Sequence, residues 1–509
     1  MKYRYLWLLI VAAFLLRLVL AFSHQSIEID GVYYARMGEN LWSGHGLVDV
    51  EGRVNTVFMP LYPVLLGLVN LVVGNLEFAA RFVAVVFGAL LIIPVFFIAR
   101  RLFSEKVAWF AAGLTVVYPA LSYIASIAYV DALFLFLLFM ALWCSLMVVD
   151  RPREWTWWSI MAFFSALSYL CRPESLLFFV LWGVVLFFLL EKRLVVRRWL
   201  VMLVIFVVVM LPYVLLVYQS TGDVSLSSKG FVIYKFRSFE PFSPAYESNI
   251  FGLNTAKDDI LLNPYTVKGS LVGEILAHPA VFLERYTSSL LREVFLTLPM
   301  LFPLVFLSLL GLWLVRRDRR QWLLVSVVLL PLVFYPVFWV EARYLLVVLP
   351  ILFMWCGVAW FWLAHRFKKL PWRLALVVLF LVLLVANVFA HQLVDKRFEK
   401  ADPPVNHKEA GLWLHSQGSA LRVMERKPWV SFYSGGLFVN FPYAEYDDLL
   451  VYACNQNVAI VVVDDRYTAQ LRPQVAFLLD NPPKELTEIY RSLDDSDRVV
   501  LYRLDCRKA

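Results

Sequence analysis

The residues of this chain best suited to chemistry lie in one polar stretch, residues 23–63, which follows the first apolar segment. This stretch opens with two carboxylates, Glu28 and Asp30. A carboxylate at a membrane surface can take a proton from an acceptor hydroxyl, which is general-base catalysis, and ionisable residues in such places tend to be functional. Asp30 could also be the N-cap of a helix over residues 31–42, and the two roles are compatible. We therefore predict that Asp30 is the general base.

Further polar side chains lie where apolar segments meet the loops of the same side. Asp131 begins a long apolar segment, and we predict it as a second catalytic residue, with a plain helix cap as the alternative. Arg172 and Glu174 could bind substrate or could pair with each other across a tight hairpin. Arg343 could bind phosphate or anchor a helix end. The residues predicted to bind the substrate or its phosphate are Glu28, Tyr62, Arg81, Arg172, Glu174, Lys229, Lys235 and Arg343.

Cofactor signatures in the sequence are weak. Glu28, Asp30 and Asp131 could together hold a divalent cation through oxygen ligands, and no other cofactor is predicted. A zinc site built from His24, Glu28 and His45 is conceivable, but the spacing matches no known pattern. The sequence contains no GxSxG element for Ser/His/Asp catalysis, and neither a GxGxxG nor a P-loop fingerprint for nucleotides. A donor that is linked to lipid therefore fits better than a nucleotide sugar.

The composition is that of a membrane protein. Of the 509 residues, 61% are hydrophobic and only 17% are charged, which is more apolar surface than a soluble chain needs. The first apolar segment is too long for the core of a signal peptide and lacks a small-residue cleavage site, so we interpret it as an anchor. The net charge of +8 comes from short basic clusters between apolar segments. Such clusters orient a membrane protein and indicate no nucleic-acid partner.

Eleven apolar segments are long enough to cross a bilayer core of about 30 Å. They are residues 5–22, 78–99, 107–124, 129–149, 157–171, 174–190, 199–218, 290–315, 322–339, 343–364 and 374–391. Residues 60–74 are also apolar, but they are few, and counting them as a span would invert every later loop. We predict that they form a helix at the outer interface, or one that re-enters it. The predicted fold is mainly α, a polytopic membrane helical bundle with about 11 transmembrane helices.

Basic residues determine the expected orientation. Lys and Arg gather in the connections of one side, which are the N-terminus and residues 100–106, 151–153, 192–198, 316–320 and 366–373. The N-terminus is therefore expected to be cytoplasmic, and an odd number of spans places the C-terminal end outside. The expected location is a cytoplasmic (inner) membrane with a periplasmic or extracytoplasmic C-terminal domain. Arg17, in the last turns of the first span, is expected to snorkel to the headgroups.

Two domains are expected. Residues 1–395 form the transmembrane domain, with outer catalytic loops at residues 23–77 and 219–289. Residues 396–509 form a small soluble α/β domain, because apolar β-like runs alternate there with amphipathic stretches. The β-like runs are Leu421–Met424, Val458–Val463 and Val499–Leu504, and the amphipathic stretches include His407–His415 and Thr468–Leu479. In an oxidising compartment Cys454 and Cys506 could form a disulfide, which the sequence leaves open.

A series of short motifs runs through the first 395 residues. They are, in order, Glu28-Ile29-Asp30 with Tyr34-Ala35 and Gly38, Pro60-Leu61-Tyr62-Pro63, Phe78-Ala79-Ala80-Arg81-Phe82, Asp131-Ala132-Leu133, Arg172-Pro173-Glu174, and Arg343-Tyr344 with Pro350. In this order the motifs resemble those of GT-C glycosyltransferases of the protein-O-mannosyltransferase and aminoarabinose-transferase type. The resemblance implies a GT-C fold and a polyprenyl- or dolichyl-phosphate sugar donor. It also implies a first-loop carboxylate as general base, which Asp30 matches.

Two departures separate this chain from the aminoarabinose-transferase type. Members of that type carry a phosphate-binding Lys before the Pro-Leu-Tyr element, where this chain has Val57-Phe58-Met59. They also carry an Arg three residues after the carboxylate, where this chain has Tyr33. The phosphate must then be bound by residues elsewhere. The candidates for this phosphate cradle are Arg172, Lys229, Lys235 and Arg343.

Together these patterns predict a membrane glycosyltransferase, either a hexosyl- or a pentosyltransferase. It would move a sugar from a polyprenyl-phosphate-linked donor to a glycan, lipid or protein acceptor at the outer face, with membrane lipid as a further partner. The alternative is a flippase or transporter of lipid-linked sugars, although ion-coupled transporters usually carry carboxylates or broken helices near the bilayer midplane. A third hypothesis is a scaffold of a cell-envelope assembly whose outer tail is the binding module.

Overall fold

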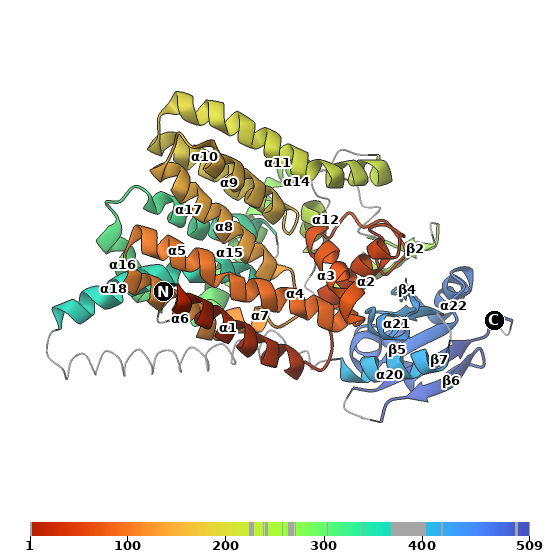
Figure 1. Ribbon diagram of the computed structural model, residues 1–509. Helices are drawn as coiled ribbons and strands as arrows, with labels where there is room; N and C mark the ends of the chain where they lie inside the picture. Colours follow the sequence, from red (N-terminus) through yellow and green to blue (C-terminus); the bar gives the residue numbers. More distant parts are fainter. Residues whose placement is uncertain are drawn as a thin grey trace.

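The computed structural model describes residues 3–222, 229–237, 239, 243–256, 258–262, 269, 271–302, 304–338, 341–367, 404–418, 421–493 and 497–507. Figure 1 shows a bundle of long helices with a small α/β domain at one end. The chain begins at the opposite end of the bundle from this domain, and it ends in the domain itself. A mainly helical bundle with a small C-terminal sheet domain is the architecture predicted from the sequence.

Runs rich in Leu, Val, Ile and Phe form most helices of the bundle, since helices that are apolar on every face are stable only inside protein or lipid. These helices are α1 (Arg4–Ser23), α4 (Leu76–Leu90), α5 (Ile92–Leu102), α6 (Glu105–Val117), α7 (Pro119–Ile124), α8 (Asp131–Asp150), α9 (Trp155–Tyr169), α10 (Ser175–Leu189), α11 (Lys192–Thr221), α15 (Pro279–Leu301), α16 (Leu304–Val315), α17 (Gln321–Phe334) and α18 (Leu349–Arg366). Each of the first ten predicted spans coincides with one or two of them. The eleventh, residues 374–391, lies outside the described residues.

Five helical stretches of the described chain are long and apolar enough to cross a membrane. They are Arg4–Ser23, Leu76–Leu102, Asp131–Asp150, Lys192–Ser220 and Ala342–Arg366. Other predicted spans are interrupted: residues 107–124 are divided between α6 and α7, where Tyr118 is extended before Pro119. A residue that precedes proline avoids the helical region, which explains this break. The predicted span over residues 343–364 begins as a 3-10 helix, η2 (Ala342–Val348), which continues into α18.

Helices α2 (Ile29–Trp42) and α3 (Leu61–Val73) lie between the bundle and the α/β domain (Figure 1). Their backbones touch, because a Cβ atom added at Gly67 would lie 2.5 Å from the carbonyl oxygen of Gly38. At 1.5 Å per residue, the 13 residues of α3 are too short to cross a bilayer core. This geometry agrees with the prediction that residues 60–74 form an interfacial helix instead of a span.

The basic clusters of several connections meet at the end of the bundle where α1 begins. Arg100 donates to the hydroxyl of Tyr3 at 2.7 Å. Arg101 and Arg320, from two different connections, both approach Asp150, at 2.5 and 3.8 Å. One prediction about a charged residue was wrong, since Arg17 does not snorkel. It is buried and donates to the carbonyl of Thr115 in α6 at 2.8 Å, because the polar backbone end of α6 lies within its reach.

The loop predicted over residues 219–289 is partly helical. It contains α12 (Lys229–Phe236), α13 (Pro244–Phe251), the two-residue strands β1 (Leu253–Asn254) and β2 (Asp259–Ile260), and α14 (Leu271–Ala277). The backbone at Phe251 and Leu253 exchanges hydrogen bonds with Tyr443 of the C-terminal domain, at 2.7 and 3.2 Å. The loop therefore joins the bundle to that domain.

The C-terminal domain is built on a five-stranded sheet in the order β4-β3-β5-β7-β6. Its strands are β3 (Arg422–Glu425), β4 (Leu437–Asn440), β5 (Ile460–Asp464), β6 (Leu486–Arg491) and β7 (Val499–Leu504). Strand β3 pairs in parallel with β4 and β5, whereas β7 is antiparallel to β5 and β6. The helices are α20 (Val405–Ser416), α21 (Trp429–Ser434) and α22 (Tyr446–Asn455). The three predicted β-like runs correspond to β3, β5 and β7, and the predicted stretch over 407–415 lies in α20.

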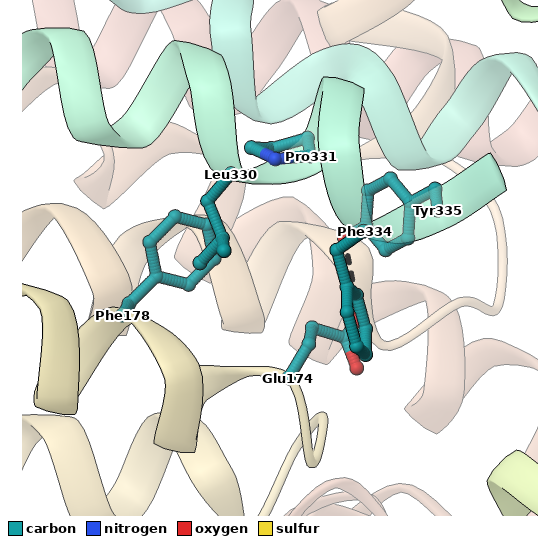
Figure 2. Close-up of a pocket in the computed structure, with 6 residues that line it drawn as sticks. All are labelled: Glu174, Phe178, Leu330, Pro331, Phe334 and Tyr335. Atoms are coloured by element: carbon teal, nitrogen blue, oxygen red, sulfur yellow. Dashed lines mark hydrogen bonds between the residues drawn. The ribbon is translucent and has the colours of Figure 1, made fainter. Parts of the chain in front are cut away.

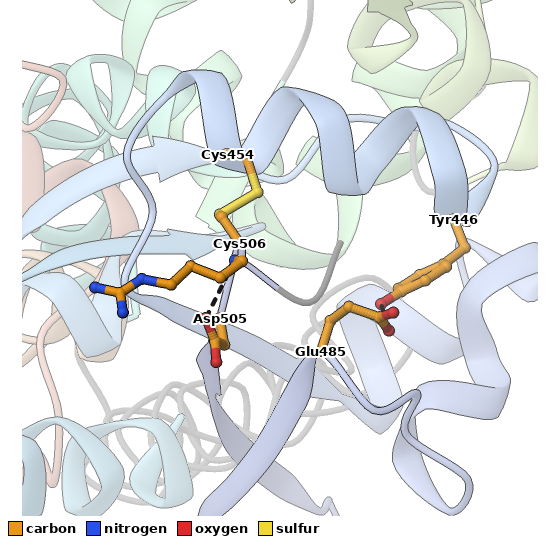
Figure 3. The surroundings of a disulfide bond; sticks show 6 residues. Tyr446, Cys454, Glu485, Asp505 and Cys506 are labelled. Carbon is orange, nitrogen blue, oxygen red and sulfur yellow. Dashed lines mark hydrogen bonds between the residues drawn. A yellow bond between two sulfur atoms is a disulfide. The ribbon is translucent and has the colours of Figure 1, made fainter.

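A disulfide links Cys454 at the end of α22 to Cys506 beyond the last strand (Figure 3). The bond closes 52 residues of the sequence and so ties the chain end to the sheet. It resolves the pairing that the sequence left open. In the same region Tyr446 donates to Glu485 at 3.3 Å, which attaches α22 to the segment before β6.

Candidate active site

Asp30 lies in the first turn of α2, where the chain enters the junction between the bundle and the C-terminal domain. Its Oδ2 is 2.9 Å from Nη1 of Arg343, which lies in η2. Arg343 also reaches Glu341 at 2.5 Å and lies 4.2 Å above the ring of Tyr129. Cation–π contacts of this kind hold a guanidinium by its face, and its N–H groups at the edge can still bind an anion. Asp30 and Arg343 are both partly exposed.

A second ion pair lies next to the first. Arg172, in the turn between α9 and α10, reaches Asp131 at 2.6 Å and Glu174 at 3.1 Å. The hydroxyl of Tyr335 donates to the same oxygen of Glu174 at 3.2 Å. In contrast to the first pair, Asp131 and Arg172 are both buried. Asp131 opens α8, so that its pairing with Arg172 ties the start of α8 to the hairpin of α9 and α10.

The ring of Tyr344 connects the two pairs. The guanidinium carbon of Arg172 lies 4.7 Å from its centroid, and that of Arg343 lies 5.3 Å from it. Two cations and several carboxylates thus meet at one end of the bundle. Five of the residues singled out from the sequence are brought together here, although the parts they play remain predictions. They are Asp30, Asp131, Arg172, Glu174 and Arg343.

A shallow pocket lies beside Glu174, between α10 and α17 (Figure 2). Its walls are Phe178, Leu330, Pro331 and Phe334, and they leave almost no room even for a water molecule. Figure 2 shows the Glu174 carboxylate and the Tyr335 ring beside these apolar side chains. Sites for drug-sized ligands measure roughly 300–1,000 Å³, so this hollow is far too small for such a ligand.

Three predicted binding residues have their polar groups engaged by the protein backbone. The carboxylate of Glu28 accepts the N–H of Ala128 at 3.0 Å, and burial raises the pKa of Glu28. The hydroxyl of Tyr62 is fully buried and donates to the carbonyl of Ala80 at 2.7 Å. Arg81 donates to the carbonyl oxygens of residues 21, 24 and 26 and pairs with Glu77 at 2.8 Å. These three side chains therefore use their polar groups to hold the backbone around the first loop.

Two further predicted phosphate ligands lie in the loop that follows α11. Lys235, at the end of α12, pairs with Glu274 of α14 at 2.6 Å. No described contact connects Lys235 to Asp30 or Arg343. Lys229 begins α12, and its side chain lies outside what the structure describes. Within the described chain, Arg343 and Arg172 are thus the cations of the predicted cradle that lie beside the carboxylates.

The predicted metal ligands do not share a site. Asp30 is paired with Arg343, Asp131 with Arg172, and Glu28 with a backbone N–H. Across the described ranges, no group of three His, Cys, Asp or Glu residues is arranged to hold a metal ion. Two arginines next to the carboxylates would also repel a divalent cation. As arranged, these residues do not fit a bound metal.

The C-terminal domain makes hydrogen bonds to the first loop immediately before Asp30. The sequence did not indicate this contact. The hydroxyl of Tyr433 accepts the N–H of Ile27 at 2.9 Å, and the indole of Trp429 donates to the carbonyl of Ile27 at 3.0 Å. Both aromatic residues belong to α21. Arg36 of α2 in turn donates to the carbonyls of Ser431 and Phe432, each at 3.3 Å. Helix α21 therefore holds both sides of the segment that presents Asp30.

A second contact of this domain involves a buried carboxylate that the sequence also did not single out. Glu247 of α13 accepts two hydrogen bonds from Arg426 at 2.9 Å and one from Arg472 at 2.6 Å. Burial by itself would raise the pKa of Glu247, but the charges of the two arginines and the hydrogen bonds from Arg426 outweigh it, so the pKa lies below its usual value. The only sequence signal was the run Glu425-Arg426-Lys427 directly after a predicted strand. Its partner could not be known without the fold.

Comparisons with known proteins support the resemblance inferred from the motifs. Residues 59–217, about a third of the chain, match the family described as dolichyl-phosphate-mannose-protein mannosyltransferase. No curated protein matches the sequence. The match covers α3 to α11, which includes Asp131, Arg172 and Glu174 but not Asp30 or Arg343.

Two solved structures share the fold over nearly the whole chain. ArnT from Cupriavidus metallidurans bound to undecaprenyl phosphate is 16% identical, with a TM-score of 0.62 and 98% of each chain covered. The oligosaccharyltransferase of Archaeoglobus fulgidus tethered with an acceptor peptide is 14% identical, with a TM-score of 0.62; the match covers 91% of this chain and 69% of that one. At such identities the likeness shows the fold. The chain has the GT-C fold that the motifs predicted.

Proposed function

We propose that this chain is a glycosyltransferase that moves a sugar from a polyprenyl-phosphate donor to an acceptor at the outer face of the membrane, with Asp30 as general base. The observation that carries the proposal is the partly exposed Asp30–Arg343 pair, at 2.9 Å, at one end of an apolar bundle. The carboxylate can take the proton of the acceptor, and the guanidinium beside it can stabilise the charge of the departing phosphate. The undecaprenyl phosphate bound by ArnT, a protein of the same fold, supports a lipid-phosphate donor.

Glycosyl transfer breaks the bond between the anomeric carbon and a phosphate oxygen, through a transition state with oxocarbenium character. Asp30 removes the proton of the acceptor as the acceptor atom bonds to the anomeric carbon. The electron pair of the broken bond stays on the phosphate oxygen, and polyprenyl phosphate leaves. The products are the glycosylated acceptor and the lipid phosphate, with the acceptor's proton on Asp30.

Arginine beside the base stabilises the charge that develops on the departing phosphate, because a planar guanidinium can hold two phosphate oxygens at once. Arg343 is the first candidate, since it is partly exposed and stacked on Tyr129. Arg172 is the second candidate, since it contacts the same Tyr344 ring as Arg343. The apolar surface of the bundle near the pocket beside Glu174 would guide the polyprenyl chain.

The topology proposed here places the site and the C-terminal domain on the outer side and the N-terminus in the cytoplasm. It rests on two observations. The basic clusters at Arg100, Arg101 and Arg320 meet at the end of the bundle where α1 begins. The site and the C-terminal domain lie at the other end (Figure 1). Because basic residues favour the cytoplasmic side, this arrangement supports residues 396–509 as an outer domain.

The test is the release of polyprenyl phosphate from polyprenyl-phosphate sugars by the purified protein. Asp30→Asn is expected to lower transfer about 100- to 10,000-fold, the range that general bases contribute. Glu39→Gln is the matched control on the same helix, where Glu39 pairs with Arg36 at 2.7 Å away from the site. It should leave transfer nearly unchanged. Transfer by Asp30→Asn at the wild-type rate would contradict the assignment, and a flippase would release no polyprenyl phosphate in any variant.

A further inference from the structure

Each of the two arginines at the candidate site contacts two carboxylates. The contacts are those of Arg172 with Asp131 and Glu174, and those of Arg343 with Asp30 and Glu341. This group of six side chains therefore carries more negative than positive charge before any substrate binds. A lipid phosphate would bring further negative charge, and like charges at such short distances repel each other. An arginine of this group can receive a phosphate only if a carboxylate gives way.

The guanidinium of Arg343 is engaged by a carboxylate at both of its edges. Glu341 accepts a hydrogen bond from Nε at 2.5 Å, and Asp30 lies 2.9 Å from Nη1. The guanidinium carbon lies 4.2 Å from the ring centroid of Tyr129 and 5.3 Å from that of Tyr344. Two parallel N–H···O bonds to a phosphate form only along an edge of a guanidinium. Binding of a phosphate in this way therefore displaces one of the two carboxylates.

Glu341 is better able to leave Arg343 than Asp30 is. The side chain of Glu341 is 37% exposed and that of Asp30 is 25% exposed. Glu341 comes two residues before Arg343, so their contact joins no distant parts of the chain. Across the described ranges, the Glu341 carboxylate makes no hydrogen bond or ion pair to another element. The contact between Asp30 and Arg343, in contrast, joins α2 to η2.

The carboxylates at Arg172 are held more firmly than Glu341. Glu174 also comes two residues from its arginine, but it accepts a second hydrogen bond, from the hydroxyl of Tyr335 at 3.2 Å. Asp131 is buried together with Arg172. An exposed ion pair contributes little to stability, whereas the loss of one partner of a buried pair is costly. A carboxylate is therefore displaced more easily at Arg343 than at Arg172.

We propose that Glu341 occupies Arg343 in the empty site and is displaced by the phosphate of the donor, so that Glu341 sets how tightly the lipid phosphate binds. The proposal rests on the proposed function and deepens it, because it assigns the competitor that the phosphate must replace. When transfer is complete, the same carboxylate can return to Arg343 as polyprenyl phosphate leaves. Glu341 acts through Arg343 and is a positioning residue.

The test is equilibrium binding of undecaprenyl phosphate to the full-length protein in micelles. Glu341→Gln keeps the shape of the side chain and removes its charge. Glu39→Gln is the matched control, because Glu39 is 36% exposed and pairs with an arginine of its own, Arg36, at 2.7 Å. Undecaprenol, which lacks the phosphate, is the second probe. Neither probe carries a sugar, so the result does not depend on glycosyl transfer.

Glu341→Gln is expected to tighten the binding of undecaprenyl phosphate about two- to fivefold, which is the effect of one exposed ion pair. Glu39→Gln should bind this lipid as the wild type does, and binding of undecaprenol should not change in either variant. Unchanged or weaker binding of undecaprenyl phosphate by Glu341→Gln would overturn the proposal. An equal gain in Glu39→Gln, or an equal gain for undecaprenol, would also overturn it, since the effect would then not be specific to Arg343 and the phosphate.

A double variant tests whether the gain depends on Arg343. In the background of Arg343→Met, the change Glu341→Gln should give no gain, because no guanidinium remains to be released. A gain that persists there would contradict the proposal. In transfer assays, Glu341→Gln alone should lower the KM for the donor without raising kcat, as expected for an interaction that affects bound donor and transition state equally.

The two proposals can fail separately. If Glu341→Gln binds undecaprenyl phosphate more tightly but the wild-type protein transfers no sugar, the proposed function fails and the displacement of Glu341 stands. If the wild-type protein transfers sugar while Glu341→Gln and wild type bind the lipid phosphate alike, the displacement fails and the proposed function stands.

Discussion

Two aspartate–arginine pairs lie next to Tyr344, and they differ mainly in their access to solvent. The side chains of Asp30 and Arg343 are 25% and 17% exposed, whereas those of Asp131 and Arg172 are 4% and 8% exposed. The chemical groups are the same and the distances are similar, 2.9 and 2.6 Å. Of the two pairs, the first is more accessible to solvent. If the proposed function holds, burial, more than residue type, separates the reacting carboxylate from the one that stabilises the fold.

The two pairs also differ in what surrounds them. Asp131 opens α8, and its arginine lies in the hairpin between α9 and α10, so that this pair joins three helices of the bundle. Asp30 opens α2, which is held from the other side by α21 of the C-terminal domain. The buried pair is therefore part of a rigid frame, and the exposed pair lies where two domains meet. Sites between domains are common places for ligands to bind.

The largest expected effect on stability follows from breaking the buried pair. Asp131→Asn leaves Arg172 without its closest carboxylate in a buried place, and the removal of one partner of a buried ion pair costs about 3–5 kcal/mol. We expect a large fall in the thermal unfolding midpoint of the protein in micelles. Turnover per folded molecule should fall less than in Asp30→Asn.

A surface pair at the other end of the same helix provides the control. Asp150 ends α8 and reaches Arg101, whose side chain is half exposed, at 2.5 Å. Pairs of this kind contribute about 0–1 kcal/mol, so Asp150→Asn should hardly change the unfolding midpoint. If Asp131→Asn were as stable as Asp150→Asn and equally inactive as Asp30→Asn, Asp131 would be catalytic, as the sequence suggested.

An intermediate effect is expected from breaking the exposed pair on its cationic side. Arg343→Met should lower transfer about 100-fold, the typical loss when a charge-stabilising donor is removed from an active site. Arg343→Lys should restore only part of this, because an ammonium does not reproduce a bidentate guanidinium stacked on Tyr129. Steady-state transfer and thermal unfolding are measured together. A loss of stability as large as that of Asp131→Asn would mean that both pairs are structural.

The smallest effect should come from weakening the hydrogen bonds between α21 of the C-terminal domain and the first loop. Tyr433→Phe removes the hydroxyl that accepts the N–H of Ile27 and contacts Glu77. The loss of one such hydrogen bond costs about 1 kcal/mol. Transfer should fall several-fold, since Asp30 is held less firmly, and hydrogen exchange at residues 25–30 should become faster. Unchanged exchange in this segment would show that α21 does not hold it.

The helices of the bundle could be predicted because their signal is local. An apolar run such as Asp131–Asp150 is sufficient by itself to indicate a span, and the helix over residues 61–73 was recognised as too short. The breaks within predicted spans were harder to see. The 3-10 helix at Ala342–Val348 depends on packing of η2 against its neighbours and leaves no periodicity in the sequence.

The site was predicted less completely, for a different reason. The sequence shows that Arg81 and Tyr62 lie near a span end, but it does not show that backbone carbonyls engage their donors. Asp30 and Arg343 were found because both lie in polar stretches at the ends of apolar runs. The contact of α21 with Ile27 was missed because the tail was interpreted as a separate soluble domain. This contact depends on how the two domains dock, which no local pattern records.

The most direct test of the account is a single-turnover transfer assay with Asp30→Asn, carried out after donor binding has been measured on the same protein. We predict that the variant binds undecaprenyl phosphate within about threefold of the wild type and transfers sugar at least about 100 times more slowly, because the acceptor keeps its proton. Transfer within tenfold of the wild-type rate, with the donor bound, would contradict the assignment of Asp30 as the general base.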